Sequence, residues 1–234
     1  MLLYIVRHGH PDYATDSLTE RGWLQAEAVG KRLAATGIDQ VYSSPMGRAK
    51  QTAEPTCRLL GLDCQIEPWA HEVGQERLTA EPYGNPVSIT MVQNTFYREN
   101  GGIDLPYDRA YEAVGFRASG MKTATARIEE GGRAFLERLG YREEAGVYRI
   151  LQPNEDNVAL FCHSVMARAW ISTLLHIPIH LMWSGFRYTH TGVTVLNFPN
   201  NENGFTAPIC LCYNDMSHLY AHGPDMYYDL TGEL

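Results

Sequence analysis

The sequence predicts an α/β fold: a three-layer α/β/α sandwich with a mostly parallel central sheet and an inserted cap segment. Two observations carry this prediction. Short apolar runs alternate with amphipathic segments over most of the chain, and the alternation breaks off between about residues 74 and 121. A chain of 234 residues, 44% of them apolar, can bury one large core. We therefore expect a single domain over residues 1–234, with a cap or lid inserted at about 74–121.

The first strand and the first helix have clear local signals. Residues 2–6 form a continuous apolar run, as in a strand buried on both faces. The next stretch has apolar residues at helical spacing, with Ser17 or Thr19 as the capping residue and Gly37 as the stop. These signals predict a strand followed by a helix that returns along the sheet.

The second strand–helix unit follows the same order. Residues 40–43 are expected to form a strand, and Pro45 suits the first turn of the next helix. Pro55 lies inside that helix and should kink or split it, because proline lacks a backbone N–H. A third strand is expected near residues 64–67.

The alternation resumes after the irregular segment. A helix is expected over about residues 123–139, followed by a strongly apolar strand that ends at His163 and a helix that begins at Ser164. Two late strands are expected at residues 192–198 and 207–213. In the last one, Cys210 and Cys212 alternate as two residues on one strand face.

Composition excludes several kinds of partner. A net charge of −8 and a pI near 5.6 argue against a broad surface for nucleic acid or anionic membrane. No apolar run approaches the roughly 18 residues of a membrane span, and the first residues lack the basic flank of a signal peptide. Five cysteines without a framework spacing are typical of reduced thiols. We expect a cytoplasmic protein whose partner is a small molecule.

Polar residues follow the ends of the predicted strands. In chain order they are Arg7 and His8, Arg48, His71 and Glu72, and His163 and Ser164. The carboxyl ends of parallel strands meet at one edge of the sheet, where ligands of open α/β sheets bind. Arginine forks, histidines and two helix N-termini at one edge would suit a phosphate dianion. The alternative for each residue taken singly is an ordinary polar turn or a solvated side chain.

Five motifs together carry a family resemblance. The stretches "VRHGHPDY", "LTERG", "SSPMGRAKQTAE", "HEVG" and "FCHS" resemble the histidine phosphatase superfamily, also called the phosphoglycerate-mutase-like family. The resemblance covers about residues 1–72 and 157–198. It implies that His8 is a nucleophile that becomes phosphorylated and that Glu72 donates a proton to the leaving oxygen. It also implies a phosphate-binding set, namely Arg7, Arg48, His163 and Ser164, with His163 counted among the catalytic residues as well.

The implied chemistry suits these residue types. A neutral imidazole nitrogen is a competent nucleophile, and the carbonyl near Gly9 could accept a hydrogen bond from the other ring nitrogen of His8. Gly9 would leave room for the phosphate. Two arginines and a protonated His163 would supply positive charge to the transferring group, so neither a metal nor another cofactor is needed.

The motifs depart from the family pattern at three positions. Ala14 stands where many relatives have a phosphate-holding Asn, so Thr15 or His10 would have to substitute. Ser164 replaces a common Gly and could act through its backbone N–H. His190 stands where a late family strand is usually introduced by Asn. His10 and His71 either line the pocket or only shape their loops.

Two histidine pairs have the i, i+4 spacing that can present zinc ligands on a helix. The pairs are His176 and His180, and His218 and His222. Pro178 makes a continuous helix across the first pair improbable on geometric grounds. The second pair has Asp215 and Asp225 as additional candidate ligands. Because spacing is weak evidence where no helix is known, we expect no metal at this pair.

Substrate choice is expected to depend on the insert and the late loops. Candidate contacts there are Arg98, Arg109, Arg117, Arg187, Tyr83, Tyr97, Tyr107, Tyr111 and Tyr188. The tyrosines could equally form the small core of a cap. The leading interpretation is a phosphomonoester hydrolase acting through a phosphohistidine on a small metabolite. The alternatives are a phosphoglycerate-type mutase and a non-catalytic phosphate-binding protein. A homodimer is one option for the oligomeric state.

Overall fold

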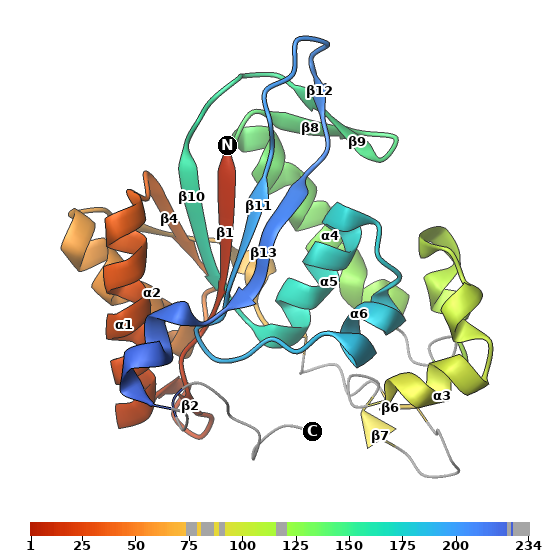
Figure 1. Ribbon diagram of the computed structural model, residues 1–234, viewed down its shortest axis with the longest axis horizontal. Helices are drawn as coiled ribbons and strands as arrows, with labels where there is room; N and C mark the ends of the chain where they lie inside the picture. Colours follow the sequence, from red (N-terminus) through yellow and green to blue (C-terminus); the bar gives the residue numbers. More distant parts are fainter. Residues whose placement is uncertain (74–78, 81–86, 89–91, 116–120, 224–225, 227–234) are drawn as a thin grey trace.

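The central sheet of the protein has six strands and is mostly parallel, as predicted (Figure 1). The computed structural model describes residues 1–73, 79–80, 87–88, 92–115, 121–223 and 226. The strand order is β13-β11-β1-β10-β4-β5. Strands β1, β10, β4 and β5 run parallel, whereas β11 is antiparallel to both its neighbours. The strands are β1 (Leu2–Arg7), β4 (Gln40–Ser43), β5 (Cys64–Ile66), β10 (Asn157–Cys162), β11 (Val193–Asn197) and β13 (Ile209–Asp215).

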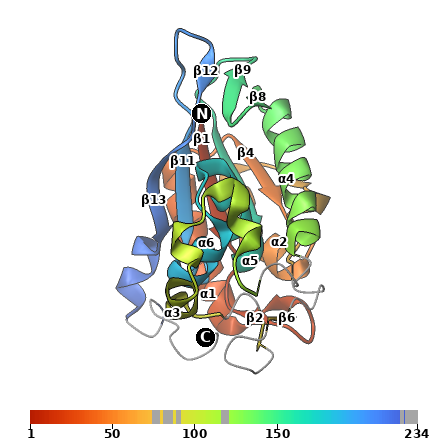
Figure 2. The same ribbon diagram turned by 90° about the vertical axis from the view of Figure 1, so that its right-hand side faces the viewer.

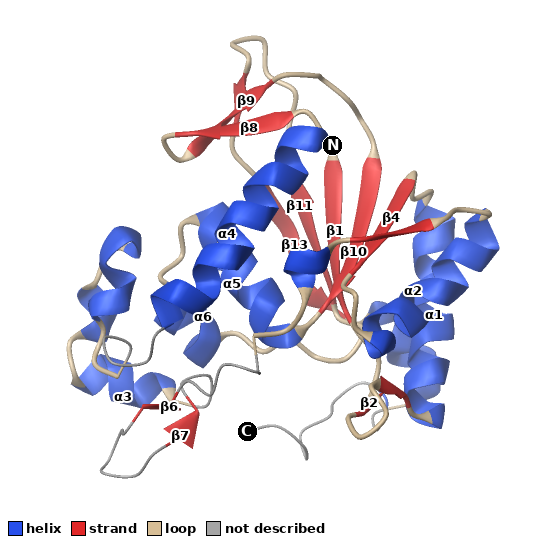
Figure 3. Ribbon diagram, turned by 180° about the vertical axis from the view of Figure 1, so that it is seen from behind, coloured by secondary structure: helices blue, strands red, loops and turns tan. Residues whose placement is uncertain are grey.

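Helices cover both faces of this sheet, which confirms the three-layer α/β/α sandwich. Helices α1 and α2 lie on one face, and α4, α5 and α6 lie on the other (Figure 3). Alternate residues of β1 serve the two cores: Leu3 and Ile5 pack on the α4–α5 side, while Tyr4 and Val6 pack on the α1–α2 side. The helices are α1 (Glu20–Thr36), α2 (Gly47–Leu60), α4 (Met121–Arg138), α5 (Ser164–Leu175) and α6 (Ile179–Gly185).

The ends of the first two helices follow from local sequence. Thr19 caps α1 by accepting a hydrogen bond from the Gly22 N–H, and Gly37 ends it in the left-handed conformation at φ 74°. Pro55 neither splits nor ends α2, so of the two predicted effects, a kink or a split, the split is wrong. A Cβ on Gly30 would lie 2.8 Å from the Pro55 Cβ, so the absent side chain lets α1 approach α2 closely at this proline.

The segment predicted as a cap contains short elements that pack against α6 (Figure 1). Tyr97 is buried with its ring 5.1 Å from that of His180, and the Tyr107 ring stacks on His176 at 4.7 Å. Tyr97 therefore belongs to the hydrophobic core rather than to a separate core of a cap, whereas Tyr107 is only partly buried. The elements are β6 (Thr79–Ala80), β7 (Val87–Ser88), α3 (Asn94–Glu99), η4 (Gly102–Asp104) and η5 (Tyr107–Glu112). Arg117, Tyr83 and parts of the 74–121 segment lie outside the described residues.

Smaller elements were not predicted from the sequence. A three-stranded sheet made of β12, β9 and β8 lies at the end of the molecule where β1 begins (Figure 2). No helix in the described part of the chain is long and apolar enough to cross a membrane. The remaining elements are β2 (Pro11–Asp12), β3 (Ser17–Leu18), η1 (Pro68–Ala70), β8 (Tyr141–Glu144), β9 (Val147–Ile150), β12 (Phe205–Thr206) and η6 (Ser217–His222).

Candidate active site

Strand pairing brings the two motif histidines together. Arg7, the last residue of β1, pairs in register with Cys162 of β10, and the backbone N–H of His8 donates to the Cys162 carbonyl at 2.9 Å. The next residue after each strand is then a histidine, and the ring centroids of His8 and His163 lie 5.1 Å apart. The carboxyl ends of the two central strands therefore hold both imidazoles at one place, as the sequence predicted.

The His8 imidazole is held in one tautomer. Its Nδ1 lies 2.7 Å from the Gly9 carbonyl oxygen, and because a carbonyl can only accept, Nδ1 carries the hydrogen. Nε2 then keeps its lone pair. Burial, followed by the charges of Arg7 and the two neighbouring histidines His163 and His190, lowers the pKa of His8 well below its usual 6.5. The side chain is thus neutral at physiological pH and is competent as a nucleophile.

Gly9 serves a different purpose from the expected one. A Cβ at Gly9 would lie 2.7 Å from the Gly22 carbonyl oxygen, and a Cβ at Gly22 would lie 2.2 Å from the His10 carbonyl oxygen. The space freed by the missing side chain is therefore filled by the first turn of α1. These two glycines let the histidine loop lie directly against that helix.

His163 is oriented by a serine at the end of β4. Its Nε2 lies 2.7 Å from Ser44 Oγ, and that same oxygen accepts a hydrogen bond from the Met46 N–H at 3.3 Å. When the Ser44 hydroxyl donates to Nε2, the imidazole hydrogen lies on Nδ1. His163 Nδ1 is buried and has no hydrogen-bond partner among the described residues. This unpaired N–H is suited to donate to an anion.

The protonation state of His163 differs from the expectation. Burial and then the Arg48 charge lower the pKa of His163 well below 6.5, although Asp16 acts in the opposite direction. These effects favour the neutral imidazole, whereas the sequence analysis assumed a protonated one. The donor that His163 offers is therefore a single neutral N–H group.

Arg48 lies in the first turn of α2 and is held by an acidic residue of the loop between β2 and β3. Its Nη1 lies 2.5 Å from Asp16 Oδ1, and the Gly47 N–H donates to Asp16 Oδ2 at 2.6 Å. Burial of Asp16 raises its pKa, but the hydrogen bonds from Gly47 and Arg48 outweigh burial and lower the pKa of the carboxyl overall. Arg48 is 5% exposed, and its Nε is buried without a partner within the described ranges. One edge of the guanidinium is thus fixed by Asp16, while Nε still has a hydrogen to donate.

Arg7 and Ser164 occupy the same edge of the sheet. Arg7 is 6% exposed, and its Nη1 donates to the Tyr188 carbonyl at 2.5 Å. Tyr188 is itself buried, and its hydroxyl donates to the Ile5 carbonyl at 2.7 Å. Ser164 is the first residue of α5 and is 9% exposed. The loop after α6 therefore helps to position Arg7, a contribution that the sequence did not reveal.

Glu72 lies at the amino end of α5. Its Oε1 accepts hydrogen bonds from the Met166 and Val73 N–H groups at 2.9 Å each, and its Oε2 accepts one from the Val165 N–H at 3.2 Å. The carboxylate thus caps the helix that begins directly after His163. This contact places Glu72 next to the site, and it also shows a structural role that the motif did not indicate.

Two further histidines lie near this site, His190 beside His8 and His10 beside His190. The His190 ring is 5.6 Å from that of His8 and 5.3 Å from that of His10, so the three rings form a row. His190 is 8% exposed, and burial followed by Arg7 lowers its pKa well below 6.5. In the sequence, His190 is apparent only as a departure from the family pattern. That departure was the signal that could have placed it in the site.

The other uncertain loop residues have distinct positions. His71 Nδ1 contacts the Glu72 carbonyl at 3.0 Å, and the His71 charge contributes to the lowered pKa of His163. Thr15 is exposed, and its hydroxyl contacts Asp12 at 3.0 Å and Ser17 at 2.6 Å within its own loop. Of the two proposed substitutes for the missing Asn, His10 therefore lies in the ring row and Thr15 does not.

The structure brings no metal ligands together at the histidine pairs. Within the described ranges no group of three or more His, Cys, Asp or Glu side chains could hold a metal ion. His180 Nε2 contacts the Gly102 carbonyl at 2.6 Å, and Pro178 separates its helix from α5 as expected. Both ring nitrogens of His218 have protein partners, Arg32 and Thr191. Asp225 lies outside the described residues.

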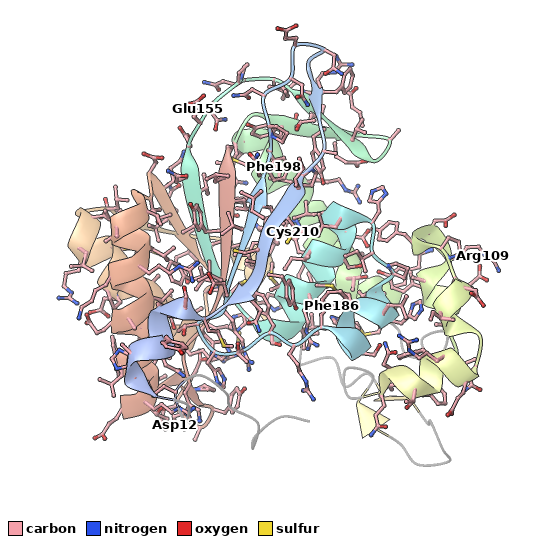
Figure 4. All side chains as sticks on the ribbon, viewed as in Figure 1. Asp12, Arg109, Glu155, Phe186, Phe198 and Cys210 are labelled. Atoms are coloured by element: carbon pink, nitrogen blue, oxygen red, sulfur yellow. The ribbon has the colours of Figure 1, made fainter. Side chains whose placement is uncertain are left out.

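The candidate specificity residues are dispersed. Arg109 pairs with Glu112 at 2.6 Å on the outer side of η5 (Figure 4). Arg98 contacts Asn94 of its own helix, and the Tyr111 hydroxyl contacts Thr125 at 2.5 Å. Arg187 is exposed and directly precedes Tyr188, whose carbonyl binds Arg7. Among the described candidates, Arg187 and Tyr188 are thus in the loop that contacts the site.

The histidine and arginine cluster at the carboxyl ends of the parallel strands gives this α/β protein a candidate site for an anion. Residues 3–83 match the sequence model of the histidine phosphatase superfamily (branch 1). A probable phosphoglycerate mutase of Yersinia pestis (strain Pestoides F) is 28% identical over 190 residues, which is 76% of each chain. A probable phosphoglycerate mutase of Citrobacter koseri is 24% identical over 238 residues, 95% of this chain and 97% of the relative. The amino-terminal third of the chain therefore matches the histidine phosphatase superfamily, and both relatives extend the similarity beyond that segment.

Solved structures show the same fold. Phosphoserine phosphatase from Entamoeba histolytica, in complex with 3-phosphoglyceric acid, has a TM-score of 0.59 and 20% identity, covering 93% of this chain and 98% of the other. A mycobacterial glucosyl-3-phosphoglycerate phosphatase has a TM-score of 0.57 and 19% identity, covering 91% and 98%. The α-ribazole phosphatase from Shigella flexneri has a TM-score of 0.56 and 20% identity, covering 92% and 96%. At these identities the likeness concerns the fold.

Proposed function

We propose that this protein is a phosphomonoester hydrolase that acts through a phosphohistidine at His8. The supporting observation is a neutral imidazole with a free Nε2 lone pair next to the His163 ring. His163 Nδ1 and Arg48 Nε, in the first turn of α2, are both buried and lack partners in the described part of the chain. Buried donors without partners are costly, and a bound phosphoryl group would supply their acceptors. With Arg7, the same groups would stabilise the charge on the equatorial oxygens during transfer.

The proposed reaction has two half-reactions. In the first, His8 Nε2 forms a bond to phosphorus, the ester oxygen leaves, and the protonated Glu72 carboxyl gives its proton to that oxygen. In the second, the Glu72 carboxylate takes a proton from water, whose oxygen attacks the phosphohistidine and releases inorganic phosphate. This role is supported by the hydrogen bonds of Glu72 to the first turn of α5, the helix that follows His163 directly.

A mutase is the second candidate. The relatives from Yersinia pestis and Citrobacter koseri are both named as probable phosphoglycerate mutases. In that reaction the phosphoryl group returns from His8 to the bound substrate, which requires the intermediate to be kept from water. A phosphate-binding protein without turnover is the third alternative. Release of nitrophenol from p-nitrophenyl phosphate, isomerisation of 3-phosphoglycerate, and phosphate binding without either product distinguish the three.

The substrate class is a small phosphomonoester. Names of the similar structures include phosphoserine and glucosyl-3-phosphoglycerate, and both compounds carry a carboxylate besides the ester. A phosphatase panel should therefore contain phosphorylated hydroxy and amino acids beside sugar phosphates and nucleotide monophosphates. The cytoplasmic location, the absence of a required metal and the homodimer stay predictions of the sequence.

The central test is His8→Ala. The substitution removes the nucleophile, so hydrolysis of p-nitrophenyl phosphate should be abolished while the far-UV circular dichroism is unchanged. The wild-type protein should also form an acid-labile, base-stable phosphoenzyme that His8→Ala does not form. His222→Ala is the matched control, because His222 is an exposed histidine of η6. Near wild-type hydrolysis by His8→Ala would exclude the proposed mechanism.

A further inference from the structure

The residue after His190 has an unusual backbone conformation. Thr191 is completely buried and has a φ of 55°, in the left-handed region that β-branched residues rarely adopt. Its N–H is shared between the carbonyl oxygens of Arg7 at 3.1 Å and His8 at 3.2 Å. A strained residue persists only where the surroundings hold it. Here the strained residue contacts the backbone of both site residues at the end of β1.

The Thr191 hydroxyl connects the backbone of His190 to His218, which is distant in the sequence. Its single hydrogen is donated to the His190 carbonyl at 2.8 Å. The neighbouring His218 Nε2, at 3.1 Å from Thr191 Oγ1, must therefore be the donor in their hydrogen bond. His218 Nδ1 then accepts from Arg32 Nη1 at 3.3 Å, since a guanidinium can only donate. The two contacts agree on one neutral tautomer of His218.

His218 is itself fixed by two other elements. Arg32 of α1 forms an ion pair with Asp215 at 2.7 Å and donates to the Asp215 carbonyl at 3.2 Å. Asp215 is the last residue of β13, and η6, which carries His218, follows directly. His218, which contacts Thr191, is thus held by a helix and by the edge strand of the sheet, two regular elements of the fold.

The chain of contacts ends at the His8 ring. Thr191 holds the backbone of His190 through its hydrogen bond to the His190 carbonyl. The His190 ring lies 5.6 Å from the His8 ring, and the His163 ring lies 5.1 Å from it. We propose that Thr191 and His218 are positioning residues, which hold the His190 ring against His8 and so set the orientation of the nucleophile. The inference rests on the proposed function of His8, and it adds a C-terminal segment to the residues on which catalysis depends.

The test compares variants that keep or remove the hydroxyl and the ring donor. Thr191→Val keeps the β-branch and removes the hydroxyl, whereas Thr191→Ser keeps the hydroxyl. His218→Leu removes both polar contacts, whereas the amide of His218→Gln can donate to Thr191 and accept from Arg32. His222→Gln is the matched control on the same element, since His222 is exposed. Hydrolysis of p-nitrophenyl phosphate gives kcat and KM, and thermal unfolding confirms that each variant is folded.

A lost neutral hydrogen bond corresponds to a change of about 3- to 10-fold. We expect Thr191→Val and His218→Leu to lower kcat by about that factor with little change in KM, because orientation of the nucleophile affects the chemical step. Thr191→Ser and His218→Gln should recover most of the rate. The double variant Thr191→Val/His218→Leu should be no slower than Thr191→Val alone, because both changes remove the same link. Unchanged kcat in Thr191→Val, or additive losses in the double variant, would overturn the inference.

A second readout does not depend on turnover. The imidazole nitrogen and proton NMR signals of His8 and His190, assigned with single-residue variants, should shift in Thr191→Val and stay in place in His222→Gln. If the wild-type protein has no hydrolytic activity, the proposed function fails, and these signals still decide the positioning. Unchanged signals of both histidines in Thr191→Val would then refute it.

Discussion

Acidification should destabilise the protein partly through His218. Burial, followed by the Arg32 charge, lowers the pKa of His218 from 6.5 to about 4. The unfolded chain therefore binds a proton at this imidazole near pH 6.5, whereas the folded chain binds it only near pH 4. Between these values the unfolded state holds more protons, so the free energy of unfolding falls as the pH falls. From about pH 7 to about pH 5 this single group should lower stability by about 2 kcal/mol.

The assay is urea unfolding of the wild-type protein and of His218→Gln at both pH values. Gln does not titrate, so the variant should lose about 2 kcal/mol less than the wild-type protein between the two pH values. Losses due to His8, His163 and His190, whose pKa values are also lowered, are common to both proteins and cancel in the comparison. His222→Gln should behave as the wild-type protein does. Equal losses in wild type and His218→Gln would refute the reasoning.

Three further substitutions test the site. Arg48→Ala should lower kcat for p-nitrophenyl phosphate by about 10²- to 10³-fold, because it removes a preorganised donor; a loss below about 3-fold would exclude Arg48 from the transition state. Glu72→Gln should slow hydrolysis of an alkyl phosphate by about 10²-fold or more and that of p-nitrophenyl phosphate much less. Equal slowing of both substrates would remove Glu72 from the acid role. Ser44→Ala should weaken inhibition by inorganic phosphate by about 3- to 10-fold, because the hydroxyl that fixes the His163 tautomer is lost. An unchanged inhibition constant would contradict that assignment.

The sheet was predictable because its signals are local. The apolar run before Arg7 and the one before His163 each specify a buried strand. The order of the chain then shows which residue follows each strand. Parallel pairing of these strands then brings the two histidines to 5.1 Å. Pro55 was expected to kink or split α2, but the helix continues past it from Gly47 to Leu60.

The partners of the site residues were not predictable from local pattern. Ser44 and His163 are 119 residues apart in the chain, and Arg48 and Asp16 are 32 apart. Nothing in the spacing or composition of either segment shows that their polar atoms meet. His190 was visible in the sequence only as an unusual residue at a family position.

The sequence by itself determined the strand and helix order, the residues at each strand end and the resemblance to a superfamily, because hydrophobic periodicity and motif spacing are properties of short segments. The tertiary structure decided which hydrogen bonds those residues make: Asp16 on Arg48, Ser44 on His163, and His218 on Thr191. These contacts depend on the distance and direction between atoms of different elements. Hydrogen bonds require that geometry to within a few tenths of an ångström, and only the packed sheet and helices supply it.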